Sequence, residues 1–217
     1  MSEFIDEVDE EVRREQLKKL WDRYSIFIIA LAVLIIAGVG GWRGYQYLEG
    51  QKAAEAGSAF NKALELSEQN KHADAEKAFA DVAARAPSGY RMLARFHQAA
   101  EAAMRDKAAA VKIYDELAAD RSIGAEPQSM ARLRAAGLLA DTAPYADLKQ
   151  RLEGETAPGA PFRHAARELL ALSAWKANDA AAARQWLDMI ALDGETPPGL
   201  RSRAEALQAL LPAVAKS

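Results

Sequence analysis

The longest apolar run of the chain lies close to its N-terminus and covers residues 24–42, YSIFIIALAVLIIAGVGGW, nineteen residues without a charge. At a rise of about 1.5 Å per residue, this run is roughly 28 Å long as a helix, close to the thickness of the hydrocarbon core of a bilayer. Arg23 and Arg43 flank it, and aromatic residues lie at both ends, where hydrocarbon meets the lipid headgroups. The pattern predicts a transmembrane helix over residues 24–45.

Basic residues are more frequent before this helix than after it. The 23 residues before the run carry five Lys and Arg residues, and the 23 residues from Arg43 onward carry three. An excess of Lys and Arg marks the cytoplasmic side of a membrane helix, whereas acidic residues have little effect. We therefore predict a cytoplasmic tail over residues 1–23 and a domain over residues 46–217 on the other side of the membrane.

A cleaved secretory signal is the alternative interpretation of the apolar run, because the small residues Ala37, Gly38 and Gly40 lie near its end. The apolar region of a signal peptide has only about 7–15 residues, and a short basic segment precedes it. Here the run is longer and the preceding segment is long and rich in Asp and Glu. We predict a retained anchor.

After the anchor, apolar residues recur at the spacing of a helix with one buried face, and no segment shows the alternation typical of a strand. Three of these helical stripes contain an Ala four residues before an aromatic residue. The pairs are Ala75/Phe79, Ala110/Tyr114 and Ala182/Trp186. Phe79 and Tyr114 are 35 residues apart, and Tyr114 and Trp186 are 72 apart, which is twice 36. A period near 34 with this Ala-to-aromatic spacing is typical of tetratricopeptide repeats.

The period predicts an all-α fold, in which a single N-terminal transmembrane helix is followed by a tetratricopeptide-like solenoid. We expect about four helical hairpins and a C-terminal capping helix over residues 198–215. The first helices of the hairpins are expected at about 52–69, 90–104, 127–140 and 162–177. A degenerate second helix is expected near residue 149, with Tyr145, Leu148 and Leu152 on one face. Such hairpins cannot bury their apolar faces alone, so they are expected to stack.

Composition excludes several classes of function. The chain has 217 residues, a net charge of −3 and no Cys, so a disulfide framework, a thiolate metal site and a cysteine nucleophile are excluded. After residue 47 it contains 22 basic and 23 acidic residues. A domain with so even a balance lacks the basic surface that nucleic-acid binding requires.

No motif predicts catalysis or a cofactor. His72, His97 and His164 fall in separate predicted hairpins or joints without metal-ligand spacing, so we expect no metal site. The segment GVGGWRG resembles a dinucleotide-binding loop, but Arg43 takes the place of its third Gly and no strand precedes it. Neither a nucleophile elbow nor a phosphate-binding loop is present. We expect a protein that is not an enzyme and has no cofactor.

The remaining candidate function is recognition of another protein. In stacked helical hairpins the first helices usually line the concave side, where a peptide or partner helix lies. Polar and aromatic candidates on these helices are Tyr90, His97, Arg132, Arg134, Arg163 and His164. Phe60 and Phe96 share the helices but are expected in the core. Arg suits a binding groove because it binds carboxylates bidentately, although the alternative is that these residues are simple solubility charges.

Small residues cluster at the outer end of the predicted anchor. Ala37 and Gly41, and likewise Gly40 and Gly44, have the small-xxx-small spacing that allows a second membrane helix to approach closely. We therefore predict a helix interface at these four residues. The alternative is that Gly is simply frequent in membrane helices.

Residues 17–64 carry a resemblance to a known family. They combine Trp21-x-x-Tyr24 before the apolar run, Gly41-Trp42 and Tyr45 after it, and an Ala-rich helix with Phe60. This order resembles the YfgM-like family, the tetratricopeptide-like ancillary subunits of the bacterial SecYEG translocon. The resemblance implies an inner-membrane protein whose repeat domain lies in the periplasm, binds the translocon and a PpiD-type foldase, and assists exported proteins.

Two hypotheses from different classes follow. The first is a translocon-associated binding module, in which both the glycine face of the anchor and the repeats bind partners. The second is a structural scaffold of another envelope complex, such as one for cell division or outer-membrane assembly, in which the anchor is only a tether.

Overall fold

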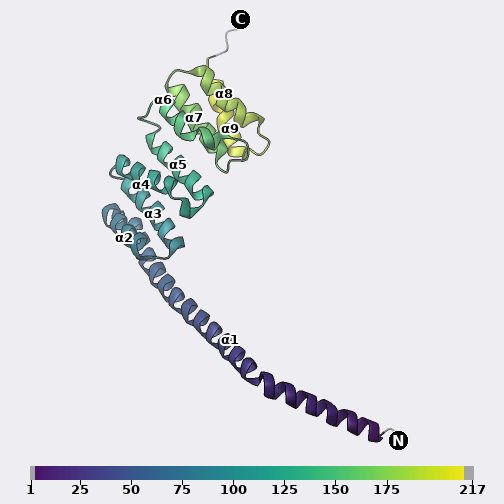
Figure 1. Ribbon diagram of the computed structural model, residues 1–217. Coiled ribbons are helices and arrows are strands. Elements are labelled where there is room, and N and C mark those ends of the chain that lie inside the picture. Colours follow the sequence, from purple (N-terminus) through teal and green to yellow (C-terminus); the bar gives the residue numbers. More distant parts are fainter. Residues whose placement is uncertain (1–2, 213–217) are drawn as a thin grey trace. The chain divides into compact units, whose positions relative to one another are not determined.

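The computed structural model describes residues 3–212, with side chains at positions 14, 18, 21, 23–27 and 29–212 (Figure 1). Every regular element in this range is a helix, which confirms the predicted all-α fold. The α-helices are α1 (Glu3–Glu68), α2 (His72–Arg85), α3 (Ser88–Ala103), α4 (Lys107–Ala119), α5 (Ala125–Leu139), α6 (Tyr145–Leu152), α7 (Arg163–Lys176), α8 (Ala180–Leu192) and α9 (Pro198–Leu210). Two 3₁₀-helices are η1 (Arg121–Ile123) and η2 (Glu153–Thr156).

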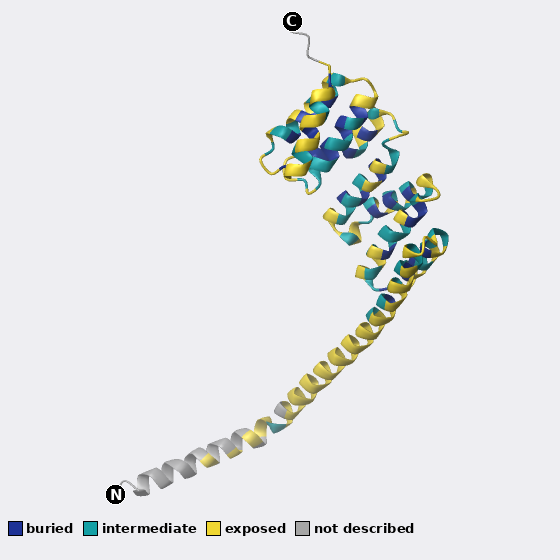
Figure 2. Cartoon of the chain, turned by 180° about the vertical axis from the view of Figure 1, so that it is seen from behind, coloured by how far each residue is buried: buried dark blue, intermediate teal, exposed yellow. Residues whose placement is uncertain are grey.

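The chain divides into two compact units, Met1–Lys52 and Ala53–Ser217. In the first unit, the described large hydrophobic side chains of α1 are exposed, from 46% at Tyr24 to 72% at Ile26 (Figure 2). Among the described residues, α1 is the one helix long and apolar enough to cross a membrane. Its length and composition fit a membrane anchor or a signal sequence. Most side chains of the predicted tail over residues 1–23 lie outside the described residues.

The second unit is a series of helical pairs in which each helix packs mainly against its neighbours in the sequence (Figure 1). The C-terminal part of α1 precedes α2, and the pairs α3/α4, α5/α6 and α7/α8 follow, with α9 as the last helix. These elements match the predicted hairpins and capping helix. The capping helix ends at Leu210, before an extended Leu211, and residues 213–215 of the prediction lie outside the described range.

Two hairpin turns have the same backbone geometry. Asn70 follows α1 with φ 58° and Asn178 follows α7 with φ 60°, the left-handed region that Asn tolerates better than most residues. In both turns the next residue donates its N–H to the carbonyl five residues earlier at 2.9 Å, which satisfies a carbonyl at the helix end. Asp106 and Asp179 then cap α4 and α8 by accepting backbone N–H bonds.

Buried Ala and aromatic residues form the cores of the pairs. Ala75, Phe79 and Ala110 are fully buried, and Tyr114 and Trp186 are 5% and 8% exposed. In the last pair, Ala182 is half-buried while the adjacent Ala183 is fully buried, so the deepest small residue lies one position later than in the other pairs. The short α6 buries Leu148 and Leu152 completely. This helix is the degenerate member expected near residue 149.

Polar contacts join equivalent positions of successive pairs. The joined residues are separated by 34 to 36 positions in the sequence, which is the period of the apolar pattern. The contacts are Ser67–Glu101 (2.6 Å), Asp115–Arg151, Asp141–Lys176 (2.6 Å) and Glu168–Arg203 (2.7 Å). The sequence repeat is therefore also a repeat in space, as in a solenoid whose units contact only their neighbours.

Candidate functional site

A groove of about 460 Å³ opens among α3, α4, α5 and α7 of the second unit. Three of these helices are the first helices of their pairs, the elements expected to line a binding surface. The lining residues all lie within helices and are Ala100, Ala103, Tyr114, Leu133, Arg134, Gly137, Leu138, Ala165, Glu168, Leu169 and Leu172. Most of this lining is apolar, and the groove is open to solvent along one side.

Small residues leave part of the groove open. A Cβ atom placed on Gly137 would meet no atom within 4 Å, apart from its own helix backbone and chain neighbours. Ala100 is exposed, and Ala165 is half-buried. Leu133 and Leu169 pack against one core cluster and Leu138 packs against another, so the groove lies between two buried cores. An approaching apolar segment can therefore contact the helices closely.

Two charged residues line the groove, and they differ in their partners. Arg203 binds both carboxylate oxygens of Glu168, at 2.7 and 3.0 Å, so this negative charge is paired. Arg134 is exposed and has no carboxylate within 4 Å among the described residues. Burial raises the pKa of Tyr114, and the positive charge of Arg134 opposes this shift. The groove thus carries one uncompensated positive charge.

The other predicted groove residues make contacts inside the chain. The ring of His97 stacks on Phe79 with centroids 5.0 Å apart, and Phe60 packs against both His97 and Tyr90, at 5.2 and 6.0 Å. The Arg132 Nε donates to Glu155 at 2.5 Å. Of the six side chains predicted, Arg134 is the one that lines the groove. Partner binding by the other five stays a prediction.

A family model described as a tetratricopeptide repeat-like domain matches residues 18–185, most of the chain. The chain belongs to this family. The match begins before the apolar run and ends within α8, so it includes the apolar part of α1 together with the helical pairs. Comparison with curated proteins gave no match, and comparison with solved structures gave none.

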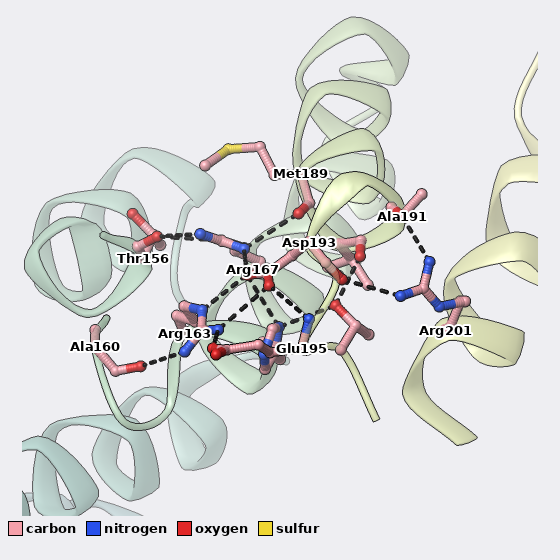
Figure 3. Close-up of polar contacts among 12 residues, drawn as sticks. Thr156, Ala160, Arg163, Arg167, Met189, Ala191, Asp193, Glu195 and Arg201 are labelled. Carbon is pink, nitrogen blue, oxygen red and sulfur yellow. Dashed lines mark hydrogen bonds and ion pairs between the residues drawn. The ribbon is translucent and has the colours of Figure 1, made fainter. Parts of the chain in front are cut away.

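Near the end of the tetratricopeptide-like domain, five charged or titratable residues form what we call the Asp193 cluster (Figure 3). Its members are Arg163, His164, Arg167, Asp193 and Glu195. The Asp193 carboxylate accepts from Arg163 at 2.8 Å and from Arg167 at 2.9 Å. Arg163 also pairs with Glu195. The cluster joins α7 to the loop between α8 and α9.

Arg167 is the buried centre of this cluster, at 3% exposed. Besides Asp193, its guanidinium donates to the carbonyl of Thr156 at 2.9 and 3.1 Å and to that of Met189 at 3.1 Å. From the far side, Arg201 donates to the carbonyl of Asp193 at 2.9 Å. These bonds hold η2 and the C-terminal end of α8 on α7, and they hold the start of α9 on the loop after α8.

The pKa shifts in the Asp193 cluster have local causes. Hydrogen bonding from Arg163 holds the pKa of Asp193 far below its usual range, and the same contact raises the pKa of Arg163. Burial lowers the pKa of His164, and the positive charge of Arg163 lowers it further. The two Arg side chains and the Asp193 carboxylate are bound to each other and lie outside the groove lining. We therefore interpret the cluster as a structural lock, that is, a set of contacts that stabilises the fold.

Sequence reasoning missed Arg167, Asp193 and Glu155 as important residues. Two signals in the sequence point to the first two residues. Arg163-x-x-x-Arg167 places two cations on one face of a helix, and an acidic loop comes later in the chain, after α8. The sequence does not show that this loop folds back onto α7.

The four residues predicted as a membrane-helix interface, Ala37, Gly40, Gly41 and Gly44, are all exposed on α1. A Cβ atom at any of the three glycines would meet no atom within 4 Å outside its own helix backbone and chain neighbours. A second helix at this face stays a prediction. Among the described residues, no group of three or more His, Cys, Asp and Glu side chains is arranged to hold a metal ion.

Proposed function

We propose that this protein is an inner-membrane-anchored, periplasmic tetratricopeptide-like protein that acts as an ancillary subunit of the Sec translocon. In this proposal the apolar part of α1 anchors the chain with its N-terminus in the cytoplasm. The second unit binds SecYEG and periplasmic chaperones, among them a PpiD-type foldase, and so assists exported proteins. The partner identities rest on the resemblance of residues 17–64 to the translocon subunits.

The observation that carries the proposal is the groove on the first helices, within a chain that also has a helix able to span a membrane. A largely apolar groove between helices suits the binding of a protein segment, whose apolar side chains enter the groove. Family membership supports the same class of function, because tetratricopeptide-like pairs stack into extended surfaces that bind proteins.

The surroundings of the groups whose pKa values are shifted favour a binding function over catalysis. Asp193 and Arg163 have the largest pKa shifts, and each has the other as its principal partner. A general acid or base needs a free proton position facing a cleft. The residues of the Asp193 cluster lie outside the groove lining, and we therefore propose that the protein is not an enzyme.

A retained anchor is favoured over a cleaved signal by the extent of the family match. The match begins at residue 18, so the apolar run belongs to the family pattern together with the repeats. The run of nineteen residues is also longer than the apolar region of a signal peptide, which has about 7–15 residues. The intact mass of the protein from membranes tests this point directly, because cleavage after the apolar run removes about 40 residues, or more than 4 kDa at about 0.11 kDa per residue.

The proposal is tested by extraction of the tagged protein in a mild detergent, followed by mass spectrometry of the proteins that copurify. A matched version carries an unrelated membrane anchor in place of residues 1–47. We expect SecYEG subunits and a PpiD-type foldase with the native protein, and loss of SecYEG after the anchor exchange. Recovery of cell-division or outer-membrane assembly proteins with both versions would instead support the scaffold hypothesis and overturn the translocon role.

A further inference from the structure

We propose that the groove among α3, α4, α5 and α7 binds an apolar segment of a partner protein that places one Asp or Glu side chain against Arg134. This inference deepens the proposed function and rests on it, because it names the chemistry of the partner segment. Three observations support it: the unpaired cation, the apolar lining with an open space at Gly137, and the purely helical walls.

The charge of the groove selects the acidic group. Arg134 has no carboxylate partner among the described residues, whereas Arg132, two positions earlier on α5, is bound to Glu155. Glu168 on the opposite wall is bound by Arg203. Covering Arg134 with an apolar segment alone would remove water from an unpaired guanidinium, which is costly. A carboxylate on the segment compensates this loss with a charge-assisted hydrogen bond.

The rest of the lining selects apolar side chains. Leu133, Leu138 and Leu169 are half-buried on the walls, and each packs against a core cluster. The space over Gly137 is open to a side chain of the partner. Apolar groups that enter this space leave water, which is the main favourable contribution to such binding.

The helical walls favour an internal acidic side chain over a C-terminal carboxylate. A terminal carboxylate is captured by free backbone N–H groups that form a concave nest. All lining residues of this groove lie inside α-helices, beyond the first turns that leave N–H groups free, apart from Ala165 in the first turn of α7. The side-chain donors in the lining are the Arg134 guanidinium and the Tyr114 hydroxyl, and the charged guanidinium suits a side-chain carboxylate.

The test measures peptide binding by fluorescence polarisation, with the full-length protein in lipid nanodiscs. The probes are labelled twelve-residue peptides with four Leu residues. Three are acetylated and amidated and carry a central Glu, Gln or Lys; a fourth carries Gln and a free C-terminal carboxylate. The variants are Arg134→Glu, Gly137→Leu and Gly137→Ala, and the matched control is Arg121→Glu, which reverses an exposed charge outside the groove.

We expect the wild type to bind the Glu peptide about fivefold more tightly than the Lys peptide, the upper range for a partly exposed ion pair. Arg134→Glu should reverse this preference, and Gly137→Leu should remove binding of every peptide. Gly137→Ala and Arg121→Glu should keep the wild-type order. Circular dichroism of each variant checks that the helices are intact, and a Gly137→Leu variant that fails to fold leaves the Arg134→Glu reversal as the deciding result.

Equal affinity for the Glu and Lys peptides would overturn the inference, as would a preference that persists in Arg134→Glu. If the Gln peptide with a free C-terminus binds more tightly than the Glu peptide, a terminal carboxylate is the true ligand. That result would also overturn the inference. These failures are distinct from failure of the proposed function. If SecYEG still copurifies with the native protein, the translocon role stands while the assignment of the groove is wrong.

Discussion

Phe79 of α2 and His97 of α3 stack nearly parallel, with ring centroids 5.0 Å apart and an angle of 23° between the rings. Phe60 from the end of α1 meets both rings edge-on at 5.2 Å. Three helices of the second unit thus meet in one aromatic contact. Aromatic pairs of this kind add about 0.5–1.5 kcal/mol beyond the effect of burial. This contact holds the last turns of α1 onto α2 and α3.

Replacement of Phe79 by Ala should therefore destabilise the second unit strongly. Phe79 is fully buried, and a buried Phe→Ala change costs about 3–5 kcal/mol through lost burial and the cavity that remains. Thermal unfolding of the full chain in detergent measures the effect. Leu93→Ala is the matched control on α3, because Leu93 is 46% exposed and its loss should change stability by less than about 0.5 kcal/mol. Equal effects of both changes would contradict the assignment of this core.

Arg167→Met tests the Asp193 cluster as a structural lock. Met keeps most of the volume but removes the hydrogen bonds to Thr156, Met189 and Asp193. The buried carbonyl of Thr156 loses both of its bonds from Arg167, whereas Asp193 keeps its bond from Arg163, so we expect a loss of about 2 kcal/mol in the free energy of unfolding. The exposed Arg121→Met change should stay within about 0.5 kcal/mol. An unchanged unfolding midpoint in Arg167→Met would show that the cluster does not stabilise the fold.

His164 should make stability depend on pH below about 6.5, the ordinary pKa of His. Burial and the charges of Arg163 and Arg167 lower its pKa, while Asp193 and Glu195 oppose this shift. The unfolded chain, with a His pKa near 6.5, then binds a proton more readily than the folded chain. The stability contribution of neutral His164 is therefore complete above about pH 6.5 and is lost as pH falls toward the lowered pKa. The midpoint difference between wild type and His164→Gln should change across this range, and a constant difference would refute the effect.

The sequence pattern predicted the helices well because each buries a continuous stripe at a repeated spacing. The Ala-to-aromatic pairs place the small and large residues of one face four positions apart, and this spacing is readable without a structure. The groove residues are harder to assign, because a first helix can contact other parts of the chain on one face and line the groove on another. On α7, Arg163 and Arg167 face the α8–α9 loop, whereas Ala165 and Leu169 line the groove.

Contacts between distant residues could not be derived from the pattern. Arg163 and Asp193 are 30 positions apart, and Arg132 and Glu155 are 23 apart. An Arg on a predicted helix looks the same in the sequence whether a loop returns to pair with it or not. Arg134 lines the groove because the residues near it in space are apolar or already paired. These neighbours are set by the tertiary structure and cannot be derived from the sequence pattern.

Two glycines should respond oppositely to replacement by Ala. Gly137 lies inside α5 with space for a Cβ atom, so Gly137→Ala should stabilise the helix by up to about 1 kcal/mol. Gly124 precedes α5 with φ +85° and ψ 166°, a conformation that is essentially restricted to Gly. Gly124→Ala should therefore destabilise the chain by about 1–3 kcal/mol. Unfolding midpoints of the two variants measure both effects. A loss of stability in Gly137→Ala would show that the space beside Gly137 is occupied in the intact protein.

Gly40→Leu separates a helix interface in the anchor from a passive tether. Gly40 and Gly44 lie one turn apart on α1, and small residues at this spacing let a second helix pack against the backbone. A Cβ atom at Gly40 meets no atom within 4 Å beyond its own helix backbone and chain neighbours, so added bulk should leave the fold and membrane insertion unchanged. If the translocon packs on this face, Gly40→Leu should reduce copurification of SecYEG, while Val39→Leu, which enlarges a residue already 58% exposed, should not. Equal recovery with both variants would assign SecYEG binding to the second unit and leave the apolar part of α1 with anchoring alone.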